Sequence, residues 1–199
     1  RVTIENHFVD IGRERIRNII EKGLSKKQKK ISSMFFYDSR GSKLFEQITG
    51  LEEYYLTGIE KELISKIYAD DGRKLANADI VELGSGDCSK ISILLYSLPE
   101  PVRNSIRYSP VDISKSVIEE SAQTLIRRFP GVCVHGVVAD FINQLSCIPQ
   151  NNKRIFCFFG STIGNFERHE GMRFMNSLGE IMQQGEELIL GLDMVKDTV

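Results

Sequence analysis

The segment Val81-Glu82-Leu83-Gly84-Ser85-Gly86-Asp87 decides the fold of this chain. It reads as the end of an apolar strand, a glycine turn and the start of a helix. Glycine has no Cβ atom, so Gly84 and Gly86 permit a tight turn and the close approach of a ligand to the backbone. In an open α/β sheet, such a turn lies in the crevice that binds nucleotide-like ligands. The alternative is an ordinary strand-to-helix turn that binds nothing.

The spacing of the glycines distinguishes between two kinds of nucleotide-like ligand. Ser89 stands where a G-x-G-x-x-G fingerprint has its third glycine. This departure disfavours a dinucleotide, whose pyrophosphate would lie over the helix N-terminus. S-adenosylmethionine has no phosphate group and suits the turn better. We therefore expect Gly84 and Gly86 to line a site for S-adenosylmethionine.

The composition describes a soluble globular protein of 199 residues with a formal net charge of −1. A net charge near zero disfavours nucleic-acid binding through phosphate contacts, and no apolar run reaches the length of a membrane span. Four cysteines without a C-x-x-C pair and three histidines without ligand spacing predict no metal site. We expect a cytoplasmic protein that binds a small molecule and neither nucleic acid nor membrane, and we leave its oligomeric state open.

The pattern of apolar residues divides the chain into two regions. Residues 1–75 read as helical and are expected to form an N-terminal helical cap that contributes to the active site. Within this cap, Thr57 followed by Glu60 matches a capping box. Residues 76–199 alternate apolar strands with helices, which predicts a mostly parallel α/β core. The expected strands are 79–83, 106–111, 132–138, 154–159 and 187–192, and the expected helices are 11–22, 42–48, 57–68, 89–98, 114–129 and 167–183.

Acidic residues stand at the ends of three successive predicted strands: Glu82, Asp112 and Asp140. The carboxyl ends of parallel strands meet at one edge of the sheet, where Asp112 could accept hydrogen bonds from both ribose hydroxyls. Asp140 offers an acceptor for an adenine amino group, and Phe141 offers a contact beside the base. Each acid alone could instead be a surface charge or a helix cap, and Asp112 with Ser114 could simply cap the next helix.

The segment Gly160-Ser161-Thr162-Ile163-Gly164-Asn165-Phe166 follows the fourth predicted strand, where a methyl group and its acceptor would meet. Asn165 offers an uncharged donor and acceptor that could position an amine or a carboxylate. Its alternative is a Gly/Asn turn with a helix cap. Tyr37 and Tyr55 lie in aromatic segments before the sheet. They could close the crevice from water, or they could belong to the packing of the N-terminal helices.

Five segments give the chain a resemblance to a known family. They are F-F-Y-D-S-R-G-S-K-L-F-E-Q-I-T, L-E-E-Y-Y-L-T, V-E-L-G-S-G, F-G-S-T-I-G-N and L-G-L-D-M-V-K-D. Together they resemble the histidine-specific methyltransferases, a family that includes the enzyme that trimethylates histidine on the route to ergothioneine. The resemblance implies a Rossmann-like class I methyltransferase sheet with a helical cap, and we expect that sheet to be incomplete in this chain. It also implies S-adenosylmethionine-dependent methylation of the α-amine of histidine or a related amino acid by SN2 displacement.

The resemblance also assigns roles to particular residues. Tyr37 and Asn165 are the candidate catalytic residues, and Tyr55 and Asn165 are expected to contact the amino acid. The expected cofactor residues are Tyr37, Gly84, Gly86, Lys90, Asp112, Asp140, Phe141, Gly160 and Ser161. The family's G-S-G-T-S-E-K is here G-S-G-D-C-S-K, which keeps the lysine as Lys90. The alternatives are methylation of another small amine, a non-catalytic module that binds the cofactor, and a dinucleotide oxidoreductase.

Overall fold

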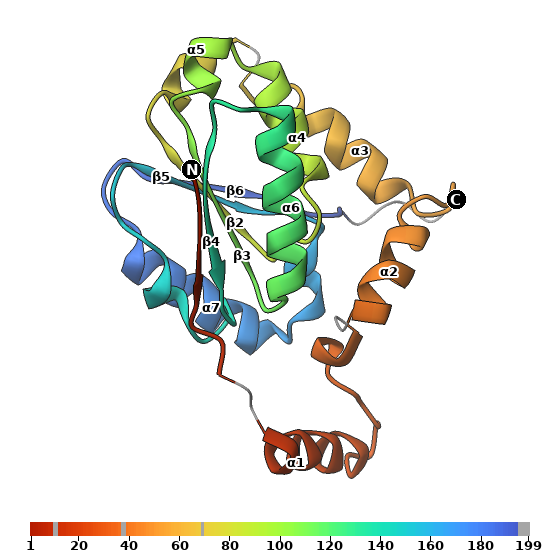
Figure 1. Ribbon diagram of the computed structural model, residues 1–199. Coiled ribbons are helices and arrows are strands. Elements are labelled where there is room, and N and C mark those ends of the chain that lie inside the picture. Colours follow the sequence, from red (N-terminus) through yellow and green to blue (C-terminus); the bar gives the residue numbers. More distant parts are fainter. Residues whose placement is uncertain (10–11, 37–38, 69, 195–199) are drawn as a thin grey trace.

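A parallel sheet of six strands forms the centre of the protein. The computed structural model describes residues 1–9, 12–36, 39–68 and 70–194. The strand order is β1-β4-β3-β2-β5-β6, and every neighbouring pair is parallel (Figure 1). The strands are β1 (Val2–Asn6), β2 (Asp79–Leu83), β3 (Arg107–Asp112), β4 (Cys133–Val138), β5 (Arg154–Phe158) and β6 (Glu187–Leu190). All five strands predicted from the sequence are present.

The strand order places a topological switch point between β2 and β5. From β2 the chain moves outward to β3 and β4, and then returns to the other side of β2 to form β5 and β6. Connections from neighbouring strands leave in opposite directions at such a point, which opens a crevice at the carboxyl ends of the strands. The glycine turn after β2 lies at this position, as the sequence predicts.

The prediction that the N-terminal region is entirely helical is wrong for residues 2–6. This segment forms β1 and pairs in register with β4, from Val2 opposite Val134 to Asn6 opposite Val138. It is an edge strand, in which two of the five residues are half-buried and the other three are exposed. The sheet therefore includes a piece of chain that precedes the helical part of the N-terminal region.

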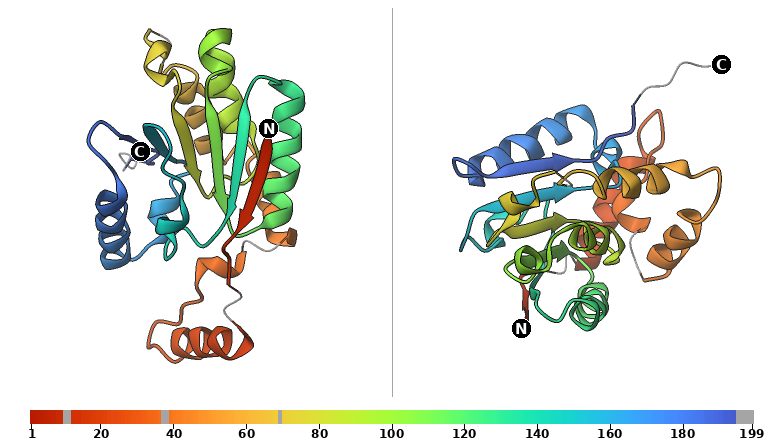
Figure 2. Two further views of the ribbon diagram at one scale, coloured as in Figure 1. Left: turned by 60° about the vertical axis from the view of Figure 1, so that its left-hand side comes forward. Right: turned by 90° about the horizontal axis from the view of Figure 1, so that it is seen from above.

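Helices cover both faces of the sheet (Figures 1 and 2). On one face, α3 (Tyr55–Ile64), α4 (Ser89–Ser97) and α6 (Lys115–Arg128) bury apolar side chains against the strands. On the other face, α7 (Arg168–Ile181) and the short η3 (Leu145–Cys147) do the same. The remaining helices are α1 (Gly12–Leu24), η1 (Ser33–Phe36), α2 (Ser39–Ile48), η2 (Gly72–Leu75), α5 (Glu100–Arg103) and η4 (Thr162–Asn165).

The centre of the sheet is filled by aromatic side chains of β5 and the residue after it. Phe156, Phe158 and Phe159 are all buried. Cys157 is buried among them, whereas Cys133 at the start of β4 is exposed. Among the described residues, no helix is long and apolar enough to cross a membrane.

Candidate functional site

The glycine turn between β2 and α4 has the geometry that glycine permits and other residues resist. Gly84 and Gly86 have φ angles of +67° and +52°, in the left-handed region. The Gly84 N–H donates a 2.8 Å hydrogen bond to the carbonyl of Val111 on β3. A Cβ atom on Gly84 would lie 3.3 Å from the Phe141 ring, whereas one on Gly86 would meet no atom within 4 Å. The turn is therefore tight on one side and open on the other.

Asp112 ends β3 and holds the two neighbouring loops together. Its Oδ2 accepts from the Gly86 N–H at 3.2 Å, and its Oδ1 accepts from the Ser114 N–H at 3.0 Å. Burial raises the pKa of Asp112, while these N–H donors act in the opposite direction. The cap of α6 is provided by Ser114, whose hydroxyl accepts from the Val117 N–H. Asp112 therefore lies beside the open side of the glycine turn, where its carboxylate could receive hydroxyl groups.

Glu82 lies beneath the glycine turn and is only 2% exposed. The Tyr108 hydroxyl donates a 2.6 Å hydrogen bond to its Oε2. Burial raises the pKa of Glu82 to about 8, an effect that Lys90 opposes. Of the three acids at strand ends, Glu82 thus belongs to the interior that supports the turn.

Asp140 and Phe141 follow β4 and have different surroundings. The Asp140 carboxylate accepts from the Ile142 N–H at 3.0 Å and from the Asn143 side-chain amide at 2.6 Å, so it closes a local turn. Phe141 packs edge-on against Phe158 at a centroid distance of 5.6 Å. Its ring also lies against Gly84, so the structure brings Phe141 and the glycine turn together as predicted. Phe141 therefore forms an aromatic wall beside the turn.

Lys90 and Gly160 meet at the carboxyl ends of β2 and β5, and both contact Glu60 of α3. Lys90 Nζ lies 2.8 Å from Oε2 of Glu60, and the Gly160 N–H donates a 2.6 Å hydrogen bond to Oε1. The capping-box prediction for Thr57 and Glu60 is wrong. Helix α3 begins at Tyr55, its N-cap residue Tyr54 makes no side-chain cap, and the Glu60 side chain crosses to the sheet instead.

Ser161 connects the turn after β5 to Tyr55. Ser161 has a left-handed backbone with φ of +53°, and its hydroxyl accepts a 3.2 Å hydrogen bond from the Asp193 N–H. The Tyr55 hydroxyl donates a 2.8 Å hydrogen bond to the Asp193 carboxylate. Asp193, which lies in the quoted L-G-L-D-M-V-K-D segment, is a site residue that the sequence analysis missed. The segment carried the resemblance, but no pattern in it linked the aspartate to a tyrosine so far away in the chain.

Of the two candidate catalytic residues, the structure describes Asn165. Asn165 ends η4, four residues beyond Ser161, and is exposed at the same edge of the sheet. Tyr37 lies outside the described residues, so its role stays a prediction. Asn165 directly precedes Phe166, whose ring packs against Phe158 and Phe174, the two rings that Phe141 also contacts.

These residues fit S-adenosylmethionine. The open side of the Gly86 turn leaves room for a ligand along the backbone. Asp112 offers a carboxylate that could accept hydrogen bonds from ribose hydroxyls, and Phe141 offers a ring that could lie beside a base. The Glu60 carboxylate neutralises Lys90 and keeps this end of the crevice from carrying an isolated cation. This edge of the sheet therefore offers open backbone, a carboxylate and an aromatic ring close together.

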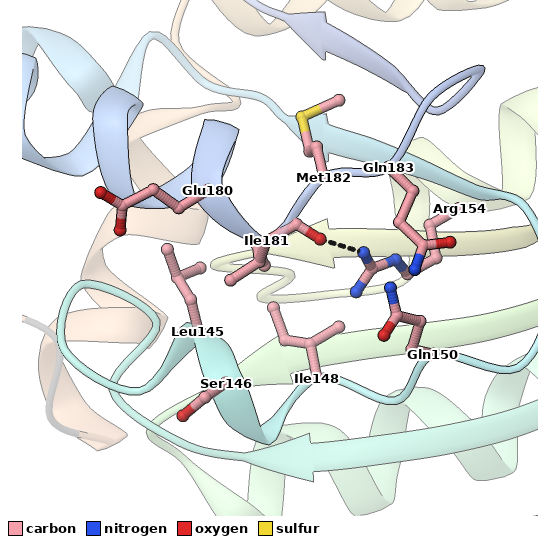
Figure 3. A pocket seen from close by; sticks show the side chains of 9 residues that line it. All are labelled: Leu145, Ser146, Ile148, Gln150, Arg154, Glu180, Ile181, Met182 and Gln183. Atoms are coloured by element: carbon pink, nitrogen blue, oxygen red, sulfur yellow. Dashed lines mark hydrogen bonds between the residues drawn. The ribbon is translucent and has the colours of Figure 1, made fainter.

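A separate cavity of about 330 Å³ lies away from this edge (Figure 3). Arg154 at the start of β5 reaches into it, and Met182 and Gln183 line it just before β6. The Arg154 guanidinium is bonded to Glu186 at 2.7 Å, and both side chains are almost fully buried. The cavity therefore belongs to the amino ends of these strands, and its arginine is already paired.

Comparison with solved structures identifies the fold of the chain. The structure of the mitomycin 7-O-methyltransferase MmcR superposes with a TM-score of 0.58 at 16% sequence identity, covering 84% of this chain and 44% of that one. At this identity the likeness shows the fold alone. The chain thus has the Rossmann-like fold of class I S-adenosylmethionine-dependent methyltransferases.

Sequence comparison gives the family. Histidine N-alpha-methyltransferases of Mycobacterium tuberculosis and Mycolicibacterium smegmatis are 38% and 35% identical over 99% and 95% of this chain. The chain spans about three fifths of their length, 61% and 59% respectively. The model of a family described as histidine-specific, S-adenosylmethionine-dependent methyltransferases matches residues 16–199. The chain therefore belongs to the family of histidine-specific, S-adenosylmethionine-dependent methyltransferases.

Proposed function

We propose that the protein transfers methyl groups from S-adenosylmethionine to the α-amine of histidine or a closely related amino acid, by SN2 displacement. The observation that carries this proposal is the 38% identity to a histidine N-alpha-methyltransferase over 99% of the chain. That span includes every candidate residue at the carboxyl edge of the sheet. The geometry of the edge supports the cofactor half of the proposal, and the similarity supports the choice of substrate.

On the cofactor side, the residues of this chain bind and orient. When bound, S-adenosylmethionine supplies an electrophilic methyl group on a sulfonium centre. Asp112 accepts hydrogen bonds from the ribose hydroxyls, and Phe141 borders the base. Gly84 and Gly86 let the backbone approach closely, and we assign Lys90, Gly160 and Ser161 to the far end of the same site. Asp140 contributes an acceptor near the base once its local turn rearranges.

On the acceptor side, the chain needs to position a neutral amine in line with the methyl group. Asn165 and Tyr55 present uncharged polar groups that orient the amino acid by hydrogen bonds, without fixing a proton on its nitrogen. Tyr37 is proposed to act with Asn165. Orientation of this kind can supply a large part of catalysis, because well-placed reactants reach effective molarities on the order of 10⁵ M.

We also propose that the helices within residues 1–75 act as a cap over the site. Two contacts support this: Tyr55 reaches Asp193 after β6, and Glu60 reaches Gly160 after β5. A cap closed by these contacts would keep water from the reacting groups. A cytoplasmic location is proposed as well, in keeping with four free cysteines. The proposed partner is a small amino acid substrate.

The test is a transfer assay with the natural full-length protein. The protein is incubated with cofactor labelled on its methyl group and with a panel of amino acids and small amines, and the products are identified by mass spectrometry. Label on the α-nitrogen of histidine supports the proposal. Label only on a different amine would replace histidine with that substrate. Tight binding of S-adenosylhomocysteine with no transfer to any amine would favour a non-catalytic module.

A further inference from the structure

Glu60 joins parts of the protein that lie far apart in the sequence. Glu60 belongs to α3, and its carboxylate contacts Lys90 of α4 and the backbone of Gly160 after β5. Its side chain is 10% exposed, so these contacts take place almost out of water. A buried carboxylate is costly unless it is paired; here Oε1 accepts a hydrogen bond from Gly160, and Oε2 makes an ion pair with Lys90 but no hydrogen bond.

The backbone around Glu60 is shaped to admit its carboxylate. A Cβ atom at Gly191, which follows β6, would collide with Oε1 of Glu60. A Cβ atom at Gly160 would lie 3.2 Å from Lys90 Nζ, closer than most real contacts. Two glycines therefore leave the space in which the carboxylate and its lysine meet. The ends of β5 and β6 and the helices α3 and α4 all converge on this one side chain.

The two ends of this connection each carry a residue proposed to contact the substrate. Tyr55 is the first residue of α3, five positions before Glu60 on the same helix. Asn165 lies five positions after Gly160, at the end of the short η4 helix. Because Glu60 accepts a hydrogen bond from Gly160, its carboxylate helps to set the separation between the helix that holds Tyr55 and the turn that holds Asn165, together with the link from Tyr55 through Asp193 to Ser161.

We propose that Glu60 is a positioning residue that sets the acceptor half of the active site by fixing α3 to the turn after β5. This inference rests on the proposed function for its catalytic consequence, but not for its structural one. Loss of the carboxylate leaves the partly buried Gly160 N–H without its acceptor. The turn then moves relative to α3, and Tyr55 and Asn165 no longer face one substrate.

The test compares four variants of the full-length protein, each measured under conditions in which it is folded. Glu60→Ala removes both contacts, whereas Glu60→Gln keeps an oxygen that can accept from Gly160. Gly191→Ala leaves Glu60 in place but forces its carboxylate aside. The matched control is Glu62→Gln on the same helix, because Glu62 forms an exposed ion pair with Lys66 of the same segment.

Two readouts are taken for each variant: hydrogen–deuterium exchange of the peptide spanning residues 159–166, and the kcat and KM for histidine. In both Glu60→Ala and Gly191→Ala, we expect exchange to become about tenfold faster and the KM for histidine to rise about tenfold. Changes of this size are expected when one hydrogen bond is lost. Glu60→Gln is expected to restore most of both. Glu62→Gln is expected to match the wild type.

The inference is overturned if Glu60→Ala or Gly191→Ala lowers only the melting temperature and leaves both exchange and KM unchanged. It is also overturned if Glu60→Gln is as impaired as Glu60→Ala, since the charge on Lys90 and not the acceptor for Gly160 would then matter. If the wild type methylates no histidine, the proposed function fails while exchange still decides the role of Glu60. If Glu60→Ala does not fold, Gly191→Ala and Glu60→Gln decide it.

Discussion

The hydroxyl of Tyr55 donates a 2.8 Å hydrogen bond to the carboxylate of Asp193, which lies 138 residues later in the chain. The Asp193 backbone N–H in turn donates to the hydroxyl of Ser161 at 3.2 Å. One aspartate therefore joins the first residue of α3 to the turn after β5. The bond fixes the direction in which the tyrosine hydroxyl points.

The first prediction concerns the coupling between these two residues. Tyr55→Phe and Asp193→Ala should each raise the KM for histidine, because each removes the hydrogen bond that orients the tyrosine. The double variant should be little worse than either single variant, with a coupling energy of about 1 kcal/mol in a double-mutant cycle. Calorimetric titration should show S-adenosylhomocysteine affinity nearly unchanged. Strict additivity, or loss of that affinity, would show that Tyr55 and Asp193 do not act together on the acceptor.

The second prediction concerns Asp112 and the ribose. Asp112→Ala should weaken S-adenosylhomocysteine binding by roughly ten- to a hundredfold, since a charged acceptor for hydroxyl groups is lost. Asp112→Asn keeps one acceptor oxygen and should fall between. The control is Glu119→Ala, which removes an exposed acid of α6 paired with Lys115. Calorimetry gives the affinities, and an Asp112→Ala protein that binds as tightly as the wild type would remove Asp112 from the site.

The third prediction separates backbone strain from crowding in the glycine turn. Gly84→Ala and Gly86→Ala both place a side chain on a left-handed backbone, which costs about 1–2 kcal/mol. Only at Gly84 does the new Cβ atom press on Phe141, at 3.3 Å. Gly84→Ala should therefore be the more destabilised of the two in urea unfolding. Equal losses would mean that Phe141 yields freely and does not form a fixed wall.

The fourth prediction follows from the buried Glu82. Its pKa of about 8 in the folded protein lies above the ordinary value of 4.5, so the folded state keeps a proton that the unfolded chain releases between these values. The contribution of this proton to the free energy of unfolding is fully present below pH 4.5. It declines as the pH rises towards 8, by at most about 1.4 kcal/mol per pH unit. Glu82→Gln keeps an acceptor for the Tyr108 hydroxyl and should flatten this decline. Urea unfolding across the same window measures it, and parallel curves for both proteins would rule out a raised pKa.

The sheet could be predicted from the sequence because its central strands carry apolar runs, interrupted only by Asp79 and Glu82 in β2 and Arg154 in β5. Strands β2 and β5 consist entirely of buried residues, and each is followed by a glycine turn. The edge strand β1 was missed because most of its residues face water, so it carries no apolar run. Pairing with β4, which lies more than a hundred residues away, creates this strand and leaves no local signal.

The site shows the same division between local and distant information. Gly84, Gly86 and Asp112 were found because turn geometry and strand ends are visible in short motifs. Glu60 was misread, because Thr57 and Glu60 match a capping box and the pattern gives no hint of Gly160, a hundred positions later. Asp193 was missed for the same reason. Such side chains take their roles from partners that only the folded chain brings near.

The central claim is that the cofactor lies along the carboxyl edge of the sheet with its reactive end towards Asn165. A crystal structure of the full-length protein with S-adenosylhomocysteine and histidine tests it most directly. The account predicts ribose hydroxyls within hydrogen-bonding distance of Asp112 and the histidine α-amine beside Asn165 and Tyr55. A nucleoside bound elsewhere, for example in the cavity beside Arg154, or a histidine that touches neither Asn165 nor Tyr55, would contradict it.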